Sequence, residues 1–164
     1  MNALFQLILS ILPLHIDFPL DKIPSQFNEA IYICGHSYKI HVDDYEKRRS
    51  DIVSYLSSEI NGWSYYFTIY PYVPNYIFTS DIMKIDYDYK NFHMYVSYGN
   101  KGDRVFIEKK LTSPFPMLLN NNDFEKIKNE IHKDRDVVSS EMFELLLNEF
   151  EQIKAAIHGN QANQ

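Results

Sequence analysis

Polar and apolar residues alternate through most of residues 63–110, and this period of two predicts a β-sheet. The clearest alternation lies in residues 83–98, and the turn residues of 99–103 predict a hairpin into a return strand at 104–109. The first run, 63–70, is aromatic on both faces, which is typical of a strand that is central or is covered on both sides. Because the runs are short and closely joined, we expect an antiparallel meander.

The residues before this stretch predict a hairpin and one helix. Two β-rich runs flank a turn at 35–37, which predicts a hairpin over residues 29–43. Apolar residues spaced by four predict a helix that begins at Asp43 or Asp44, carries the basic run 47–49 and ends at Gly62. Residues 14–20 also alternate, but their prolines favour an edge strand or an extended connection.

Two helices are predicted after the sheet, at residues 123–133 and about 139–157, each with an apolar stripe at helical spacing. We expect Gly159 to end the second helix and residues 159–164 to form a disordered polar tail. The apolar run 3–12 is too short to span a bilayer. It predicts a mostly buried N-terminal helix, with a membrane-surface anchor as the alternative.

These elements predict one α+β domain over residues 1–158. It consists of an antiparallel β-meander with an N-terminal helix, one helix before the sheet and two C-terminal helices packed on it. The length of 164 residues is sufficient for a hydrophobic core of that size.

The charge of the chain narrows the class of partner. The formal net charge is −6, which argues against direct binding of nucleic acid, because phosphates require a basic surface. Nine acidic and five basic residues lie in 111–164, whereas 61–110 holds five acidic and six basic residues. We therefore expect a basic protein partner, attracted mainly to the C-terminal segment.

The single cysteine, Cys34, excludes an intrachain disulfide and fits a cytoplasmic location. It lies near His36, His41 and Asp43, and these residue types could bind zinc. The favoured interpretation is a half-buried cysteine with surface histidines, because strand alternation does not bring all four side chains together. We therefore expect neither a metal nor another cofactor.

A second candidate site lies on the predicted sheet. Asp88 is followed by Lys90, and a strand ends in Glu108 and Lys110. This spacing resembles the PD-(D/E)xK nuclease family, in which two acids bind a metal and a lysine polarises the attacking water. The resemblance implies a metal-dependent nuclease that uses Asp88, Glu108 and Lys110. The alternative interpretation is a set of surface charges paired across strands.

Two groups of residues are candidates for binding a partner. Tyrosine offers a large contact area and a hydroxyl, so the alternating run of 86–89 is a candidate contact segment. The alternative is that a chain composition rich in tyrosine and asparagine explains the tyrosines of this run equally well. Acidic residues on one face of the last helix form the second group, whose alternative is a plain solvated face. The candidate residues are Asp86, Tyr87, Asp88, Tyr89, Asp134, Asp136, Glu141, Glu144 and Glu151.

The function that fits these features best is non-catalytic. The chain has neither a phosphate-binding glycine loop nor a nucleophile elbow. It is similar in kind to bacterial immunity proteins, which are compact and acidic and neutralise a cognate toxin. We expect an inhibitor that occludes the active site of a basic enzyme such as a nuclease. The alternatives are the metal-dependent nuclease and a phage or plasmid protein that blocks host defence by acidic mimicry.

Overall fold

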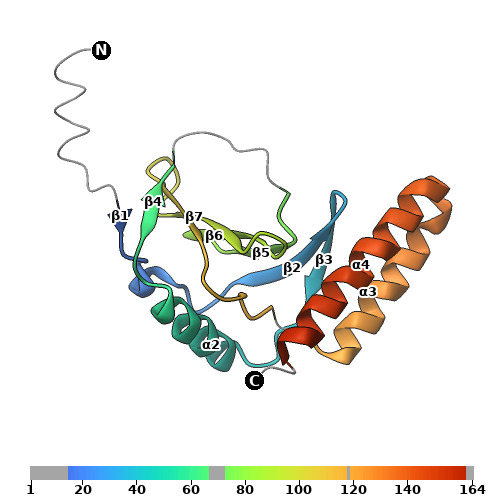
Figure 1. Ribbon diagram of the computed structural model, residues 1–164, viewed down its shortest axis with the longest axis horizontal. Coiled ribbons are helices and arrows are strands. Elements are labelled where there is room, and N and C mark those ends of the chain that lie inside the picture. Colours follow the sequence, from blue (N-terminus) through green and yellow to red (C-terminus); the bar gives the residue numbers. More distant parts are fainter. Residues whose placement is uncertain (1–14, 67–72, 118, 162–164) are drawn as a thin grey trace, which may run out of the picture.

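The structure is a computed structural model that describes residues 15–66, 73–117 and 119–161 (Figure 1). In these residues one antiparallel sheet has eight strands in the order β1-β4-β8-β7-β6-β5-β2-β3. The strands are β1 (His15–Ile16), β2 (Asn28–Ile33), β3 (His36–Ile40), β4 (Trp63–Tyr65), β5 (Tyr76–Thr79), β6 (Met83–Asp88), β7 (His93–Tyr98) and β8 (Val105–Lys110). The helices are η1 (Leu20–Lys22), α2 (Tyr45–Ser58), α3 (Asn121–Lys133), η2 (Asp134–Asp136) and α4 (Ser140–Gln161).

The expected α+β fold is confirmed. Strands β5 to β8 form the meander, the hairpin β2–β3 extends it beyond β5, one helix precedes the meander and two follow it. The short strand β1 lies at a sheet edge, as its flanking prolines predict. The expected N-terminal helix at 3–12 lies outside the described residues.

The prediction of a central strand at 63–70 was wrong in position. Strand β4 pairs with β8 on one side and with β1, at the sheet edge, on the other. Trp63 is buried because its ring lies 5.0 Å from that of Phe18 and its Nε1 donates to the carbonyl of Glu59 at 2.8 Å. A helix end and a connecting segment therefore cover this residue. Residues 67–70 lie outside the described residues.

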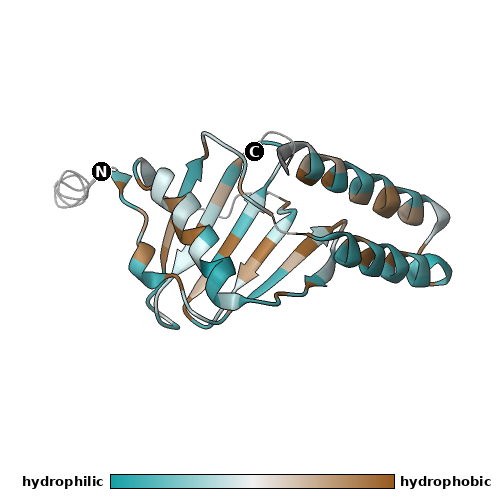
Figure 2. Ribbon diagram, turned by 90° about the horizontal axis from the view of Figure 1, so that it is seen from below, coloured by the Kyte–Doolittle hydropathy of each residue, from teal (hydrophilic) through white to brown (hydrophobic). Residues whose placement is uncertain are grey.

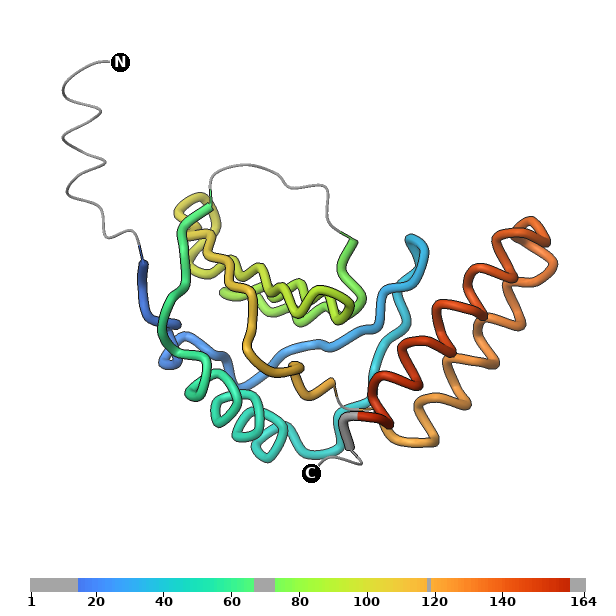
Figure 3. The backbone as a smooth tube through the Cα atoms, viewed as in Figure 1, coloured from blue at the N-terminus to red at the C-terminus, as the bar shows by residue number. Residues whose placement is uncertain are grey.

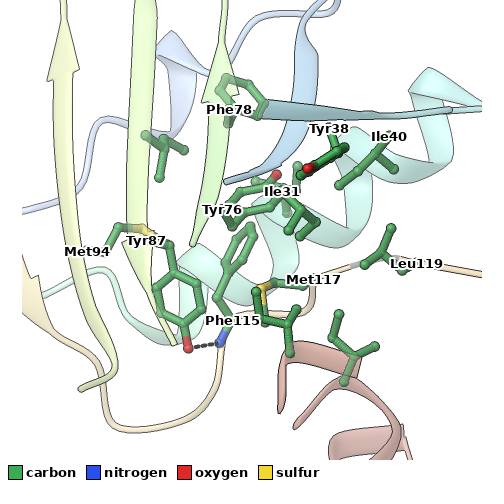
Figure 4. Packing of buried hydrophobic residues seen from close by; sticks show 14 of the residues in the cluster. Ile31, Tyr38, Ile40, Tyr76, Phe78, Tyr87, Met94, Phe115, Met117 and Leu119 are labelled. Carbon is green, nitrogen blue, oxygen red and sulfur yellow. Dashed lines mark hydrogen bonds between the residues drawn. The ribbon is translucent and has the colours of Figure 1, made fainter. Parts of the chain in front are cut away.

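Helix α2 lies along one face of the sheet (Figure 1) and buries Ile52 and Leu56 against it. The connection from β8 to α3 crosses this same side, as the tube in Figure 3 shows. Phe115, on this connection, packs between Tyr76 and Tyr87, and its backbone N–H donates to the Tyr87 hydroxyl at 3.2 Å (Figure 4). The core therefore has three layers of chain: sheet, connection and helix.

A buried ion pair joins these layers. Arg48 of α2 donates to Glu29 of β2 at 2.6 and 2.9 Å, and the two residues are 3% and 2% exposed. Arg48 also donates to the carbonyl of Pro116 at 2.9 Å, and the hydroxyl of Tyr76 donates to Glu29. The basic run at 47–49 thus includes a core residue, although its position in sequence suggests a solvated helix face.

A second buried carboxylate anchors the other end of α2. Glu59, just after the helix, lies 2.8 Å from Lys109 Nζ and accepts hydrogen bonds from the backbone N–H groups of Thr112 at 2.8 Å and Ser113 at 3.2 Å. Burial alone would raise the pKa of Glu59, but the bonds from Lys109 and Thr112 outweigh it and lower that pKa. The connection from β8 to α3 is therefore bonded near both ends of α2, by Arg48 at one end and by Glu59 at the other.

The two C-terminal helices run alongside each other and extend beyond the sheet (Figure 2). Asn120 and Asp123 form a capping box that begins α3. The predicted apolar stripe of α4 is buried, and it contains Phe143, Leu146, Phe150, Ile153 and Ile157. The expected end at Gly159 was wrong, since α4 continues to Gln161 and Gly159 does not adopt the left-handed conformation that stops a helix. Residues 162–164 lie outside the described residues.

Replacing Arg48 by alanine should destabilise the fold by about 3–5 kcal/mol, because the Glu29 carboxylate would remain buried without its cation. Urea unfolding followed by circular dichroism measures the change. Lys47→Ala is the matched control, since Lys47 is exposed on the same helix turn and should change stability by less than about 0.5 kcal/mol. Equal losses in the two variants would contradict the assigned role of the pair.

The lowered pKa of Glu59 makes stability depend on pH. A depressed carboxylate pKa stabilises the fold above the unfolded-state value, near 4.5, and this contribution is lost as the pH falls through the lower folded-state pKa. We expect Glu59→Gln to be less stable than the natural protein at neutral pH, with the difference shrinking below about pH 4.5. Urea titrations at several pH values measure it, with the exposed Glu46→Gln as control. A difference independent of pH would refute the linkage.

Candidate partner-binding surface

One side of α4 presents acidic residues to solvent. Glu141, Glu144, Asn148 and Glu151 recur at spacings of three and four, which places them on one helix face, and all four are exposed. We call these four residues the α4 acidic face. They line a shallow depression together with Leu145 and Leu147, and Leu145 is 52% exposed. The face is therefore a row of polar, mostly acidic side chains with an apolar side chain on either side of it.

The two predicted acids before α4 differ in their surroundings. Asp134 is half-buried; it accepts a hydrogen bond from the hydroxyl of Tyr38 at 3.5 Å and lies 4.0 Å from the ring of His36. Burial, together with the negative charge of Asp134, raises the pKa of Tyr38 to about 12. Asp136 is exposed, and the neighbouring Val137 is strongly exposed. Asp136 is therefore the more accessible of the two acids.

The β6 candidates are less available than alternation predicts. Tyr87 is 1% exposed and points into the core, so it offers no surface to a partner. Asp86 does lie on the opposite face of the sheet, but it is only 6% exposed and lies 3.1 Å from Lys84 Nζ. Its expected exposure was wrong, because Tyr66 and Tyr95 cover this face with rings 5.5 Å apart.

The other two candidates on and after β6, Asp88 and Tyr89, are each only partly exposed. Tyr89 is half-buried against the core, and Asp88 is partly exposed. Asp88 accepts hydrogen bonds from the backbone N–H of Lys90 at 3.0 Å and from the side-chain amide of Asn91 at 2.6 Å, and so shapes the β6–β7 turn. Its position in a turn agrees with the usual role of aspartate there.

The proposed nuclease residues do not converge. Asp88 lies opposite His93 on β7, and His93 lies opposite Lys110 on β8, so Asp88 and Lys110 are two strands, or about 10 Å, apart. Glu108 lies opposite Tyr95, and its carboxylate is 3.6 Å from His93 Nε2. Among the described residues no group of three histidine, cysteine or acidic side chains is placed to hold a metal ion.

The residues near Cys34 are also distributed along the hairpin. Cys34 lies in the β2–β3 turn with a φ of 47°, and burial raises the pKa of its thiol, with a smaller contribution from Glu149. His36 faces Asp134, whereas His41 and Asp43 form an exposed pair at 2.9 Å beyond the other end of β3. The hairpin therefore separates the set, as strand alternation predicts.

A cleft of about 850 Å³ lies where the β2–β3 turn, the β6–β7 turn and α4 meet. We call it the sheet-end cleft. Its wall includes Leu145 and Glu149 from α4, and its lining includes Asn75 and Lys90. Lys90 Nζ lies 3.0 Å from Glu149, which connects the β6–β7 turn to α4. Leu145 lines this cleft and also the depression of the α4 acidic face, so the two surfaces are continuous.

Sequence reasoning missed this cleft because its residues come from segments that are distant along the chain. One signal was present. The run of leucines at 145–147 contains more apolar residues than a single helix stripe accommodates, so at least one of them must leave the core.

In the described part of the chain, no helix combines the length and the apolar character needed to cross a bilayer. Comparisons with protein-family models, curated proteins and solved structures found no match to this chain.

Alanine substitution of two adjacent leucines, Leu145 and Leu146, tests whether Leu145 belongs to the surface. Leu145→Ala should change the free energy of unfolding by less than about 0.5 kcal/mol, because this side chain is half-exposed. Leu146→Ala should cost about 2–5 kcal/mol, because Leu146 is fully buried. Urea unfolding measures both variants, and a large loss in Leu145→Ala would show that this residue belongs to the core.

Proposed function

We propose that this protein binds a basic protein through the α4 acidic face. In its most specific form, it is an immunity protein that neutralises a cognate basic toxin enzyme, such as a nuclease, by occluding the active site. The observation that carries the proposal is the exposed acidic row, with Leu145 and Leu147 on either side of it, on a helix whose opposite side is fully used by the core.

Each part of this surface has a distinct physical role in the proposal. The acidic side chains steer a basic partner during diffusion and take the positions that substrate phosphates would occupy in a nuclease. The exposed Leu145, beside the acidic row, supplies apolar contact area. Acidic surfaces repel one another, so the same face disfavours pairing between two copies of this chain.

The proposed contact residues are a subset of those predicted from the sequence. They are Asp88, Asp136, Glu141, Glu144 and Glu151, all partly or fully exposed. Asp86 and Tyr87 are left out because they are buried, and Asp134 is left out because it is bonded to Tyr38. Tyr89 is left out because it is half-buried against the core. The same surface would serve a phage or plasmid protein that blocks a defence enzyme, and the neighbouring gene distinguishes the two: an immunity gene adjoins its toxin gene.

Charge reversal on α4 tests the proposal. The tagged protein is used to capture a partner from its host at low salt; the partner is identified by mass spectrometry and purified, and its activity is measured with and without this protein. We expect a 1:1 complex with a basic enzyme, inhibition of that enzyme and weaker binding at high salt. Substituting lysine at Glu141, Glu144 and Glu151 together should lower the association rate constant by about tenfold or more.

The matched control makes the same change of charge elsewhere. Asp21, Asp81 and Asp103 are exposed and lie away from α4, and their joint substitution by lysine should reduce the rate much less. Equal effects of the two triple variants would show that net charge, and not this face, governs binding. Magnesium-dependent cleavage of DNA or RNA by the protein itself, abolished by Lys110→Ala, would favour the nuclease function instead.

A further inference from the structure

We infer that residues 3–12 dock as a helix on a cluster of aromatic rings on the face of the sheet opposite α2. This segment is the apolar run for which the sequence predicts a mostly buried N-terminal helix, and it lies outside the described residues. The inference is independent of the proposed function, because it concerns a different surface from the α4 acidic face.

The first observation is the cluster of rings itself. The ring of Phe106 on β8 lies 5.6 Å from that of Tyr66, and the ring of Tyr66 lies 5.5 Å from that of Tyr95 on β7. We call these three residues the aromatic cluster. Among the described residues Phe106 is the most exposed aromatic side chain, at 44%. A lone exposed ring needs no explanation, but one that continues a cluster of rings indicates a contact surface.

The aromatic cluster lies on the side of the sheet that faces away from α2. Phe106 precedes Ile107 on β8, and Tyr95 precedes Val96 on β7. Ile107 and Val96 are fully buried in the core beneath α2. Because successive side chains of a strand point to opposite faces, Phe106 and Tyr95 point to the second face. A helix docked there would cover the sheet from the side opposite α2.

The second observation is the direction in which the chain enters the described fold. Strand β1 is antiparallel to β4, with His15 opposite Ser64 (Figure 1). The residues before His15 are therefore directed toward the end of β4. At that end the backbone N–H of Tyr66 donates to the carbonyl of Phe106 at 3.1 Å. Strand β1 thus directs the preceding segment toward the aromatic cluster.

The length of the segment suits this surface. Ten residues in a helix span about 15 Å, whereas the axes of β4, β8 and β7 span about 10 Å. Only residues 13 and 14 separate the segment from His15, so the near end of the helix has to stay close to the sheet edge. So short a link gives the segment a high effective concentration at its own sheet, which favours docking within one chain over docking on a second copy.

The polar and apolar positions of the segment favour an apolar surface within the protein over a membrane. Its polar residues are spaced by four and form one stripe of a helix: Asn2, Gln6 and Ser10. Leu4, Ile8 and Ile11 lie on the opposite side of such a helix and would contact the rings. The polar stripe has no basic residue, whereas helices that bind a membrane surface usually carry lysine or arginine there.

Site-specific photocrosslinking in the full chain tests this contact. p-Benzoyl-L-phenylalanine is placed at position 106, the protein is illuminated and digested with trypsin, and the crosslinked peptides are sequenced by mass spectrometry. The first trypsin site in the chain is Lys22, so attachment to the segment appears as a crosslink to peptide 1–22. We expect the attachment point to lie within residues 3–12. A mixture of isotope-labelled and unlabelled protein shows whether the crosslink joins one chain or two.

The matched control position is Phe92. It is 37% exposed and precedes the start of β7, whereas Phe106 lies opposite Ser97 near the other end of that strand. The photocrosslinker at position 92 should attach to residues 3–12 with a yield lower by about tenfold or more, because crosslinking requires direct contact and position 92 is remote from the docked helix.

Two double variants test which side of the segment makes the contact. Ile8→Glu with Ile11→Glu should lower the crosslink yield from position 106 by about tenfold or more, because burying two carboxylates opposes docking. Gln6→Glu with Ser10→Glu adds the same charge to the polar stripe and should leave the yield within about twofold. Circular dichroism verifies that all variants are folded.

Several results would overturn the inference. They are no attachment within residues 3–12, equal attachment from positions 92 and 106, or equal losses in the two double variants. Attachment only between labelled and unlabelled chains would assign the aromatic cluster to a second copy. Flotation of the protein with phosphatidylcholine vesicles, abolished by Ile8→Glu with Ile11→Glu, would assign the segment to a membrane surface. None of these results affects capture of a partner through α4.

Discussion

The ion pair between Arg48 and Glu29 is the interaction on which the arrangement of this protein depends. It joins α2 to β2, and through Tyr76 and Pro116 it also holds β5 and the connection to α3. A buried ion pair is stabilising only when its remaining donors and acceptors are satisfied. Here the Pro116 carbonyl and the Tyr76 hydroxyl supply those bonds, and the position of the connection is set by the same contacts. The start of α3, and with it the helix hairpin that carries the acidic face, follows from that position.

The elements of this fold could be predicted from sequence because local periodicity determines them. The Asp44 cap, the β2–β3 hairpin, the meander and the stripe of α4 all lie where the pattern places them. The ion pair could not be predicted, because Arg48 stands in a basic run on a helix and its partner lies 19 residues away. One sign of it existed: Glu29 has the same strand parity as the buried Ile31 and Ile33, so an acid occupies a core position of β2.

The candidate surface was predictable in part, for reasons that differ between helix and strand. Helical spacing assigned Glu141, Glu144 and Glu151 to the side opposite the core stripe, and nothing among the described residues covers that side. Alternation along β6 assigned Asp86 to the second face of the sheet, which is correct, but it contains no information on whether that face is open. Tyr66 and Tyr95, brought over Asp86 by neighbouring strands, decide its burial. The position of β4 near the sheet edge could not be predicted for the same reason, because strand order depends on pairing between segments that are distant in sequence.

The link between the sheet and α4 also bears on how the surface could act. Lys90 and Glu149 form a partly exposed pair, and such pairs contribute at most about 1 kcal/mol to stability. The position of α4 therefore depends on its buried stripe, including Leu146 and Phe150, far more than on this pair. Loss of the Lys90–Glu149 pair would consequently leave α4, and the acidic face that it carries, in place. The acidic face proposed to bind a partner is therefore held in place by buried apolar contacts and not by surface charges.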